Sequence, residues 1–396
     1  MPPKLFVFNP TCEMAVVNGH GSYRPPARLR QFENELAAIP LWLGGKDDYV
    51  LVEETVPEEF TNQLRNWGVS APQFITSIQE ISSSLSPELH PWGWSPAIHQ
   101  QFKNISKDRA AHPLLPWQAA HKQLLSRYTG LELATIVSEW IHNDAYICIP
   151  QLPEVLTSPE TIASLEAGML APILLKTPWS ASGRGLFKIR DRQENAAANT
   201  WVLGKLKQQG ALLAEPWLDK LQDLSFHFWV EEEGIEFLGT TYFNTDKDGQ
   251  FLGCYTALPS ADFLESVALR ALVERSAVLL KKALERMHLN LRYRGPVGVD
   301  ALLFKTPEGL VKLHPCIEVN LRYTMGLVNL FVAKYVHPES KGYWNIQRIT
   351  SEEWQQWQAK NPPRLKDGFW STGIFMMTPP PIKAGSMAFL NLTSLA

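Results

Sequence analysis

The amino-acid sequence predicts an α/β (α+β) protein with a small parallel sheet near its N-terminus and a larger mixed region after it. Three observations lead to this prediction. The chain has 396 residues, enough for two or three domains. Strand and helix patterns alternate along its first part, which is typical of a doubly wound sheet. Further on, apolar strand patterns follow one another closely, two of them across a hairpin turn.

Composition and charge exclude several classes of protein. The chain is 45% hydrophobic and 19% charged, an ordinary globular profile. It has 37 Lys+Arg against 40 Asp+Glu, so no global basic field favours a nucleic-acid partner. The four cysteines are scattered, which argues against a zinc site or a disulfide framework. The first apolar run is too short for a signal peptide, and no apolar stretch approaches the roughly 20 residues of a membrane span. We therefore expect a soluble, cytoplasmic protein with no membrane partner.

The N-terminal region is expected to hold the parallel sheet. Residues 5–8 form an apolar run that ends in the turn signal Asn9-Pro10, and Pro25-Pro26 opens a helical pattern that Pro40 ends. The remaining elements are a strand at 49–52, a helix at 57–67 stopped by Gly68, and a strand at 74–75. Residues 82–96, rich in Ser, Pro and Trp, are interpreted as a loop or domain boundary.

The rest of the chain mixes helices and strands. The expected helices lie at 118–128, ended by Gly130, at 157–168, started by Thr157-Ser158-Pro159-Glu160, and at 262–287, which carries an apolar stripe. The expected strands lie at 145–149, 172–176, 186–189, 212–217, 225–230, 235–242 and 251–255. Two more, at 298–304 and 311–319, form a hairpin. After residue 346 we expect one helix, beginning at Thr350-Ser351-Glu352-Glu353, and then a stretch dominated by prolines and small residues.

Lys176 stands where a strand pattern meets a loop that contains Ser182, Gly183 and Gly185. Such a loop lets backbone N–H groups approach an anion, and the lysine adds a fixed cation. The P-loop pattern is excluded because no Gly-Lys-Ser/Thr follows. A dinucleotide fingerprint is excluded because the next element is a strand and not a helix. A tight turn with one exposed lysine is the alternative.

A second set of candidates follows further along the chain. Glu215 and Trp217, at the end of an apolar strand, can frame a purine by backbone hydrogen bonds and a flat apolar wall. Asp223 can reach ribose hydroxyls. The alternative is a partly buried strand edge with solvated acids.

Asp300, Glu318 and Asn320 offer two carboxylates and an amide oxygen from two adjacent strand patterns. Mg²⁺ prefers such hard oxygen ligands, and inward-facing acids are costly to bury without a cation. The sequence therefore predicts a magnesium site here. A salt bridge to Arg294 or Arg322 is the alternative.

The order of these elements resembles the ATP-grasp superfamily. Lys176 with its loop comes first, then Glu215-Pro216-Trp217-Leu218, then Asp300, then Glu318-Val319-Asn320-Leu321-Arg322. The resemblance covers roughly 116–330, and the opening Phe8-Asn9-Pro10 with Glu13 and Ala15 looks like a poorly characterised bacterial subgroup. It implies a Rossmann-like pre-ATP-grasp domain at 1–112, an ATP-grasp small lobe at 113–210, a large lobe with the metal site at 211–345, and a C-terminal extension at 346–396.

The resemblance also implies roles for individual residues. The phosphates of ATP would meet Lys122, Lys176, Ser182, Gly183 and Gly185. Adenine would meet Glu215, Trp217 and Leu218, and the ribose would meet Asp223. Mg²⁺ would be bound by Asp300, Glu318 and Asn320. The catalytic candidates are Lys176 and Arg322, the second of which would orient a substrate carboxylate or stabilise an oxyanion. The loop is poorer in glycine than is usual in the family. The resemblance therefore does not decide whether the loop moves as a lid.

We therefore expect an ATP-dependent carboxylate–amine ligase. A substrate carboxylate would take the γ-phosphoryl group of Mg-ATP, and an amine or another nucleophile would then displace phosphate. The partners would be small-molecule or peptide carboxylates and amines, and Trp354 and Trp357 suggest a homodimer contact. A non-catalytic nucleotide-binding protein and an ATP-grasp phosphotransferase are the alternatives, because a fold does not decide an activity.

Two further groups of polar side chains are kept apart from this site. His227 and His314 lie in apolar strand patterns, where a hydrogen-bonded structural histidine is the usual finding. A second group, made up of Asn9, Glu13, Asn18 and His20, crowds the loop after the first strand. That loop lies at the carboxyl end of the predicted sheet, where ligands bind, so it is either an acceptor site or a surface loop.

Overall fold

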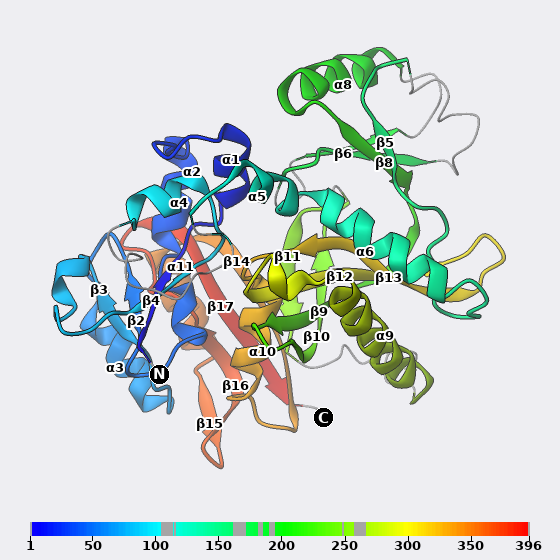
Figure 1. Cartoon of the computed structure of the whole chain (residues 1–396). Coiled ribbons are helices and arrows are strands. Elements are labelled where there is room, and N and C mark those ends of the chain that lie inside the picture. Colours follow the sequence, from blue (N-terminus) through cyan, green and yellow to red (C-terminus); the bar gives the residue numbers. More distant parts are fainter. Residues whose placement is uncertain are drawn as a thin grey trace.

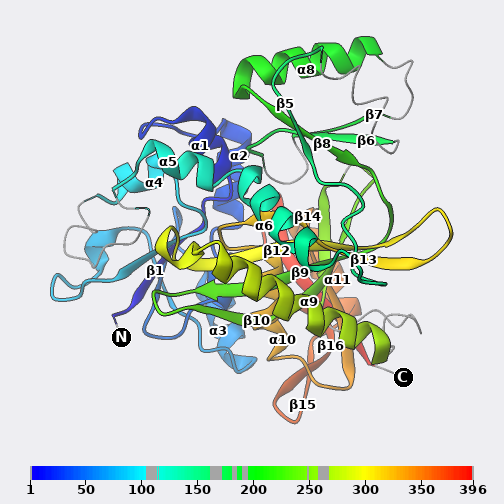
Figure 2. The ribbon, with the colours of Figure 1, turned by 45° about the vertical axis from the view of Figure 1, so that its right-hand side comes forward.

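Three sheets organise the chain (Figures 1 and 2). The computed structural model describes residues 2–103, 114, 116–160, 172–180, 185–189, 195–247, 249–256 and 267–394. A parallel sheet lies near the N-terminus, a nine-stranded antiparallel sheet forms the body, and a smaller sheet with one helix stands above that body in Figure 1.

The N-terminal sheet has the order β3-β2-β1-β4, and all its pairs are parallel, as predicted. Its strands are β1 (Lys4–Val7), β2 (Tyr49–Leu51), β3 (Gln73–Ile75) and β4 (Glu88–Pro91). The helices around it are α1 (Cys12–Asn18), α2 (Ala27–Glu35), η1 (Ile39–Trp42), α3 (Glu58–Asn66), η2 (Ile78–Glu80) and α4 (Pro96–Gln101). The loop predicted at 82–96 is wrong, because it contains β4. That strand is buried at three successive positions and so lacks the alternation that marks a strand in sequence.

The nine-stranded sheet has the order β13-β12-β9-β10-β11-β14-β17-β16-β15. Its strands are β9 (Asp219–Val230), β10 (Ile235–Thr245), β11 (Phe251–Tyr255), β12 (Gly295–Lys305), β13 (Val311–Asn320), β14 (Ser340–Thr350), β15 (Arg364–Lys366), β16 (Phe369–Met376) and β17 (Ala384–Ser394). The predicted β12–β13 hairpin is confirmed. Its helices are α9 (Val267–Arg286), η4 (Leu289–Leu291), α10 (Met325–Ala333) and α11 (Ser351–Lys360).

The C-terminal residues are more regular than their sequence suggests. The helix at Thr350 is confirmed, with a capping box between Thr350 and Glu353. Beyond it, β16 and β17 extend the main sheet, whereas proline-rich, small-residue chain was expected. The strand β14 runs across residue 345, where the sequence predicts a boundary between the large lobe and the C-terminal extension. All the predicted domain boundaries stay predictions. The tryptophan argument for a homodimer is wrong, since Trp354 is buried and Trp357 packs on Phe389. The homodimer itself stays a prediction.

The smaller sheet has the order β5-β8-β6-β7. Its strands are β5 (Glu154–Leu156), β6 (Ile173–Lys176), β7 (Leu186–Ile189) and β8 (Leu212–Pro216), and its helix is α8 (Asn195–Gln209). Most of the helix predicted at 157–168 lies outside the described residues. The strand predicted at 145–149 is reduced to a single bridge between Ile147 and Leu313.

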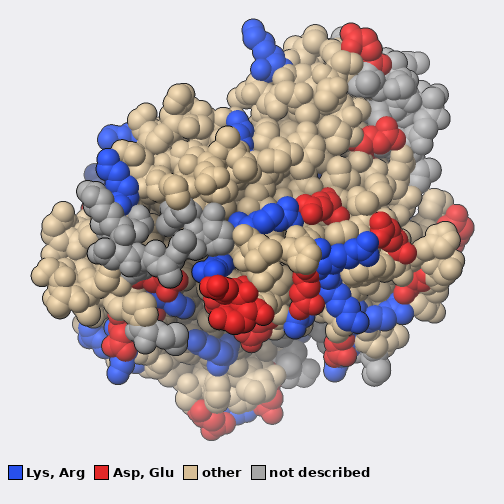
Figure 3. Space-filling view, viewed as in Figure 1, with Lys and Arg blue, Asp and Glu red and all other residues tan. Residues whose placement is uncertain are grey.

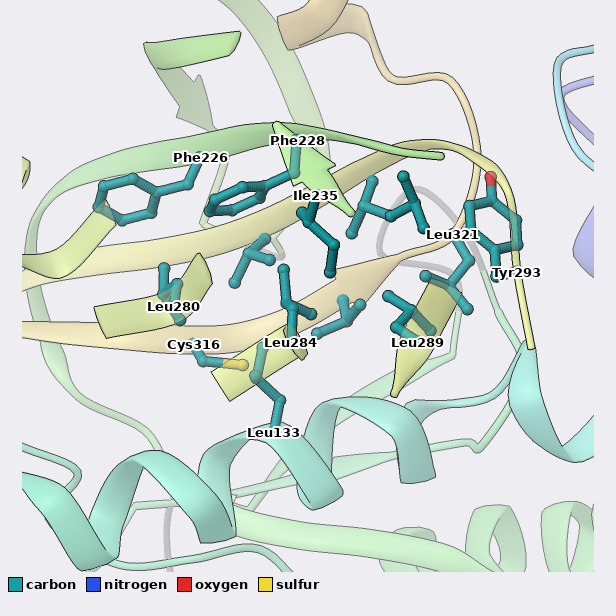
Figure 4. Packing of buried hydrophobic residues seen from close by; sticks show 14 of the residues in the cluster. Leu133, Phe226, Phe228, Ile235, Leu280, Leu284, Leu289, Tyr293, Cys316 and Leu321 are labelled. Carbon is teal, nitrogen blue, oxygen red and sulfur yellow. The ribbon is translucent and has the colours of Figure 1, made fainter. Parts of the chain in front are cut away.

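Two helices lead from the N-terminal domain to the site, where one was predicted. These are α5 (Ala119–Leu124) and α6 (Arg127–Trp140), and Ser126 caps the second by accepting a hydrogen bond from the backbone N of Tyr128 at 3.2 Å. Gly130 does not end a helix. It lies where α6 crosses β13, and a Cβ there would be 3.4 Å from the backbone N of Val319. Figure 4 shows Leu133 of α6 pointing toward Cys316 of β13 and Leu284 of α9. This packing fixes the start of α6 beside the end of β13.

The face of the molecule in Figure 3 carries no large area of a single charge sign among the described residues. In Figure 3, acidic and basic side chains are interspersed over the described residues. Within the described part of the chain, no helix combines the length and apolar character that a membrane crossing requires.

Candidate functional site

A cavity of about 450 Å³ lies between the smaller sheet and the nine-stranded sheet. This volume is in the range of small-molecule sites. The predicted site residues that line it are Lys176, Glu215, Trp217, Leu218, Asp223, Asp300, Glu318, Asn320 and Arg322. Ser182 and Gly183 lie outside the described residues. The fold thus brings together side chains from β6, β8, β9, β12 and β13.

Lys176 and Glu215 form an ion pair at the upper wall of the cavity. The Lys176 Nζ atom is 2.5 Å from Glu215 Oε1, and it donates to the backbone O of Ile317 at 3.2 Å. The lysine is buried, which contradicts the alternative of a tight turn with one exposed lysine. The second bond reaches β13, so this lysine links the small lobe to the strand that carries Glu318.

Gly185 closes the loop that follows Lys176. The backbone N of Thr177 donates to the Gly185 O at 2.9 Å, which ties the two ends of the loop together. A Cβ at Gly185 would lie 2.1 Å from the Thr177 Oγ1 and 2.3 Å from the Ser180 Oγ, so only glycine fits without a shift of the loop.

Trp217 and Asp223, which the sequence predicts to contact adenine and ribose, both line the cavity. The Lys188 ammonium lies 4.0 Å from the ring centre of Trp217, and the Trp217 backbone N donates to Pro172 O at 2.7 Å. The buried Asp223 accepts bonds from Lys220 Nζ at 2.7 Å and Thr245 Oγ1 at 2.9 Å, both on its Oδ2. These bonds hold the carboxylate in place and contradict the alternative that Asp223 is a solvated acid.

Asp300 and Glu318 face each other as register partners on β12 and β13. Enclosure of the Asp300 carboxyl, together with the nearby Glu318 carboxylate, raises the pKa of Asp300 to about 7. The Asn320 Nδ2 donates to Asp300 Oδ2 at 3.0 Å. Two carboxylates that lie side by side, one of them enclosed, suit a divalent cation with oxygen ligands. Among the described residues no three His, Cys, Asp or Glu side chains gather as a metal cluster, so two acids and the amide are the candidate set.

The alternative salt bridges are not the ones that form. Arg294 pairs with Glu232 at 2.6 Å. Glu318 is instead bonded by Arg127, whose Nη2 lies 3.0 Å from Glu318 Oε1. We did not single out Arg127 from the sequence. Ser126 is the signal that could have found it, because a capping serine there starts a new helix at Arg127 and turns that residue toward the site.

Arg322 joins the end of β13 to the N-terminal domain. Its Nε bonds the Glu13 carboxylate of α1, its Nη2 donates to Asn320 Oδ1 at 2.9 Å, and its Nη1 donates to Tyr323 O at 3.1 Å. Burial opposes the charged form of Arg322, but the acidic groups around it, with the Glu13 carboxylate first among them, together raise its pKa. Because Asn320 turns its amide oxygen to Arg322, the amide would have to rotate to bind a metal. A small cavity of about 40 Å³ lies beside these residues, between Glu13, Arg127 and Arg322.

Only part of the loop after β1 reaches the site. Glu13 does so through Arg322. Asn9 donates to Gly93 O at 2.8 Å, and the Asn18 side chain accepts a bond from the backbone N of His20 at the surface. Of the four polar residues singled out in this loop, Glu13 is therefore the one that remains a candidate for an acceptor site.

Lys122 lies apart from this cavity, whereas the structural histidine His314 lines it. Lys122 does not line the cavity; its Nζ donates to Val17 O at 3.2 Å and lies 4.8 Å from the ring centre of Trp179. Burial lowers the pKa of both His227 and His314 to about 3, so both are neutral at physiological pH. This agrees with their interpretation as structural histidines.

Comparison with known proteins identifies the fold. No family model and no curated protein matches the sequence. The biotin carboxylase domain dimer of Hydrogenobacter thermophilus 2-oxoglutarate carboxylase, in complex with MgADP, ADP and bicarbonate, is 13% identical over 100% of this chain and 86% of that one, with a TM-score of 0.54. Carboxyaminoimidazole ribonucleotide synthase from Aspergillus clavatus, complexed with ATP, is 12% identical over 100% and 94%, with a TM-score of 0.51. N5-carboxyaminoimidazole synthetase from Staphylococcus aureus, complexed with ADP, is 11% identical over 99% and 93%, with a TM-score of 0.50. These similarities show the fold alone, and they confirm the predicted ATP-grasp fold with its N-terminal domain.

Proposed function

We propose that this chain, which has the ATP-grasp fold, is an ATP-dependent ligase that joins a carboxylate to an amine or another nucleophile. One observation carries the proposal. Lys176 and Glu215 of the smaller sheet, and Trp217 directly after β8, line the same cavity as the carboxylates Asp300 and Glu318. The likeness to structures that hold ADP, MgADP or ATP supports the choice of nucleotide.

Residues in or next to the smaller sheet, together with Asp223 of β9, would bind the nucleotide. Trp217 offers a flat apolar wall for adenine, and Asp223, held by Lys220 and Thr245, offers a carboxylate oxygen to the ribose. Lys176 lies between Glu215 and β13, where it can donate to a phosphate. Binding would therefore exchange part of the Lys176–Glu215 attraction for bonds to the nucleotide.

The large-lobe residues would hold Mg²⁺ and the acid. Asp300, Glu318 and a rotated Asn320 would bind Mg²⁺, which supplies positive charge against the triphosphate. Arg127 would keep Glu318 oriented toward the cavity by its 3.0 Å bond. Arg322 would orient the substrate carboxylate and offset the charge of the oxyanion formed later.

The proposed reaction has two steps. A carboxylate oxygen bonds to the γ-phosphorus while the bond from that phosphorus to the bridging oxygen breaks, so ADP leaves and an acyl phosphate remains. The nucleophile nitrogen then bonds to the acyl carbon, inorganic phosphate leaves, and the nitrogen gives its proton to solvent. The first step needs no general base because the carboxylate is already ionised at neutral pH.

The test is to incubate the protein with Mg-ATP and a pool of carboxylates and amines, and to measure ADP and phosphate release. We expect ADP and free phosphate in equal amounts, and we expect Mg-ATP to raise the melting temperature. Glu318→Gln should abolish both effects. ADP with a phosphorylated product would favour a phosphotransferase instead, and nucleotide binding without turnover would favour a binding protein. Unchanged nucleotide binding in Glu318→Gln would contradict the assigned site.

A further inference from the structure

The floor of the cavity changes from charged to apolar along the strand order of the main sheet. The strands β13, β12 and β9 contribute Glu318, Asp300 and Asp223. The next strands in the same order, β10, β11 and β14, contribute Phe243, Phe251 and Ile346. Asp223 and Phe243 are register partners, so the change occurs between two adjacent strands.

Three apolar side chains face this end of the floor from other elements. They are Phe32 of α2, Trp92 after β4, and Met325, the first residue of α10. We name Phe32, Trp92, Phe243, Phe251, Met325 and Ile346 the apolar arm. Trp92 is buried, and the other five are half-buried against the hydrophobic core that the N-terminal and C-terminal parts of the chain share. Of the described lining residues that come from the N-terminal region, β10, β11 and β14, none carries a charge.

Arg322 and the start of α10 lie where the charged part of the cavity meets the apolar arm. Both line the cavity, and Thr324 caps the helix by accepting a bond from the Leu327 backbone N at 3.1 Å. A helix N-terminus and a guanidinium both favour a carboxylate. In the described part of the chain, three N–H groups of Arg322 have partners, of the five that a guanidinium carries. An acid bound here would direct its carboxylate to Arg322 and the rest of its structure toward the apolar arm.

This inference rests on the ligase function proposed above. We propose that the carboxylate substrate carries an aromatic or branched aliphatic group, and that the apolar arm binds this group. The group would remove apolar surface from water on both sides of the contact, which favours binding. A second charge or an amide on the acid would lose its hydration there, because the described side chains of the arm carry no charge and only one hydrogen-bonding group, the indole N–H of Trp92.

Hydroxylamine allows the acid to be tested before the natural nucleophile is known, because it traps an acyl phosphate as a hydroxamate. The protein would be incubated with Mg-ATP, hydroxylamine and single acids, with 3-phenylpropionate and 4-methylpentanoate as apolar acids. Glutarate and 4-aminobutanoate would serve as charged acids of similar length. We expect half-maximal ADP and hydroxamate formation at a concentration about 10-fold lower or more for the apolar acids.

Two variants place the specificity in the arm. Met325→Glu puts a carboxylate at the first position of α10, where the helix dipole favours a negative charge. It should reduce turnover with the apolar acids about 10-fold or more and leave the thermal shift by Mg-ATP unchanged. Ile346→Ala should shift the preference toward larger acids. Ile382→Glu, at a side chain that is 87% exposed, is the matched control and should change neither.

The outcomes separate this inference from the proposed function. If Mg-ATP binds and the charged acids are turned over as well as the apolar ones, the apolar arm does not select the substrate and the inference is wrong, while the ligase function stands. An unchanged acid preference in both Met325→Glu and Ile346→Ala leads to the same conclusion. If Mg-ATP does not bind at all, the proposed function fails and the inference fails with it.

Discussion

The Nη2 atom of Arg127 lies 3.0 Å from Oε1 of Glu318, although the two residues are 191 positions apart in the chain. The same guanidinium donates from Nη1 to the Thr177 O and to the Ser180 Oγ. One buried side chain at the start of α6 therefore connects the loop after β6 to the strand that carries the candidate metal ligands. The position of that loop and the orientation of Glu318 are coupled through Arg127.

Replacing Arg127 should disturb turnover more than nucleotide binding. Arg127→Ala removes one preorganised donor from Glu318 and from the loop, and we expect kcat/KM for ATP to fall by roughly 100-fold. Arg127→Lys should recover little of this, because an ammonium cannot replace a planar fork that serves three acceptors. The rate of ADP release at varied ATP concentration measures kcat/KM for both variants. Arg275→Ala removes a surface ion pair with Asp144 and should act like the wild type. Activity of Arg127→Ala close to that of the control would contradict the coupling.

Asp300 predicts how Mg²⁺ affinity depends on pH. Its folded pKa is raised to about 7, above the ordinary value of 3.8, so the folded protein holds a proton there that the unfolded chain has lost. Without Mg²⁺, this group therefore lowers the unfolding free energy as the pH rises from about 4 to about 7, by at most about 1.4 kcal/mol per pH unit. Above pH 7 the effect levels off.

Mg²⁺ binds the ionised carboxylate, so its affinity should rise up to tenfold per pH unit until about pH 7 and then become constant. Thermal unfolding with and without Mg²⁺ between pH 5 and 8.5 measures this. Asp300→Asn should remove the pH dependence and most of the Mg²⁺ effect. A Mg²⁺ effect that is equally large at pH 5 and pH 8 would exclude Asp300 as a ligand.

Local sequence patterns predicted many of the helices and strands. The strands that these patterns missed depend on pairing with distant parts of the chain. The hairpin that holds Asp300 and Glu318 was predictable because both of its strands are long and apolar and a Pro-Glu-Gly turn joins them. β4 and β17 were not, because β4 has only four residues and β17 carries glycine, serine and alanine. Their strand structure depends on pairing with β1 and β14, which lie far away in the sequence.

The residues of the candidate site also fall into two groups, those that local motifs predict and those that only long-range contacts bring to the site. Asp300, Glu318 and Lys176 stand in short motifs and were predictable by residue type and order. Arg127 was missed because its role comes from a break between two helices, and Glu13 could be placed only in a surface loop or an acceptor site. The Glu13–Arg322 and Arg127–Glu318 contacts join parts of the chain whose distance in space no local pattern encodes.

The Lys176–Glu215 pair allows stability and nucleotide binding to be separated. Lys176→Met leaves Glu215 enclosed without its cation, so we expect the unfolding free energy to fall by about 3 kcal/mol. Adding Glu215→Leu should recover most of that loss, since an enclosed ion pair can be replaced by apolar side chains. Mg-ATP binding should stay at least about 10-fold weaker in the double variant, because the phosphate donor is still missing. Denaturant unfolding and nucleotide titration measure the two effects. A double variant that regained full nucleotide affinity would show that Lys176 acts only in folding.

Arg322 is the residue whose replacement should separate nucleotide binding from chemistry. Its three recorded bonds go to Glu13, Asn320 and Tyr323, and it lies where the charged part of the cavity meets the apolar arm. Arg322→Lys keeps one positive charge near Glu13 but loses the second and third donors, so the substrate carboxylate would no longer be oriented. We expect the thermal shift by Mg-ATP to persist, while carboxylate-dependent ADP release falls by roughly 100-fold or more.

Glu13→Gln provides the matched comparison for that result. It keeps the shape at the other end of the Arg322–Glu13 contact and removes the charge that raises the pKa of Arg322. Since the guanidinium stays protonated at any working pH, Glu13→Gln should retain ADP release at pH 7 and change chiefly the KM for the acid. Steady-state kinetics with ATP and acid varied separately distinguish the two variants. If Arg322→Lys weakened Mg-ATP binding as much as it weakened turnover, Arg322 would belong to the nucleotide site and not to the carboxylate site.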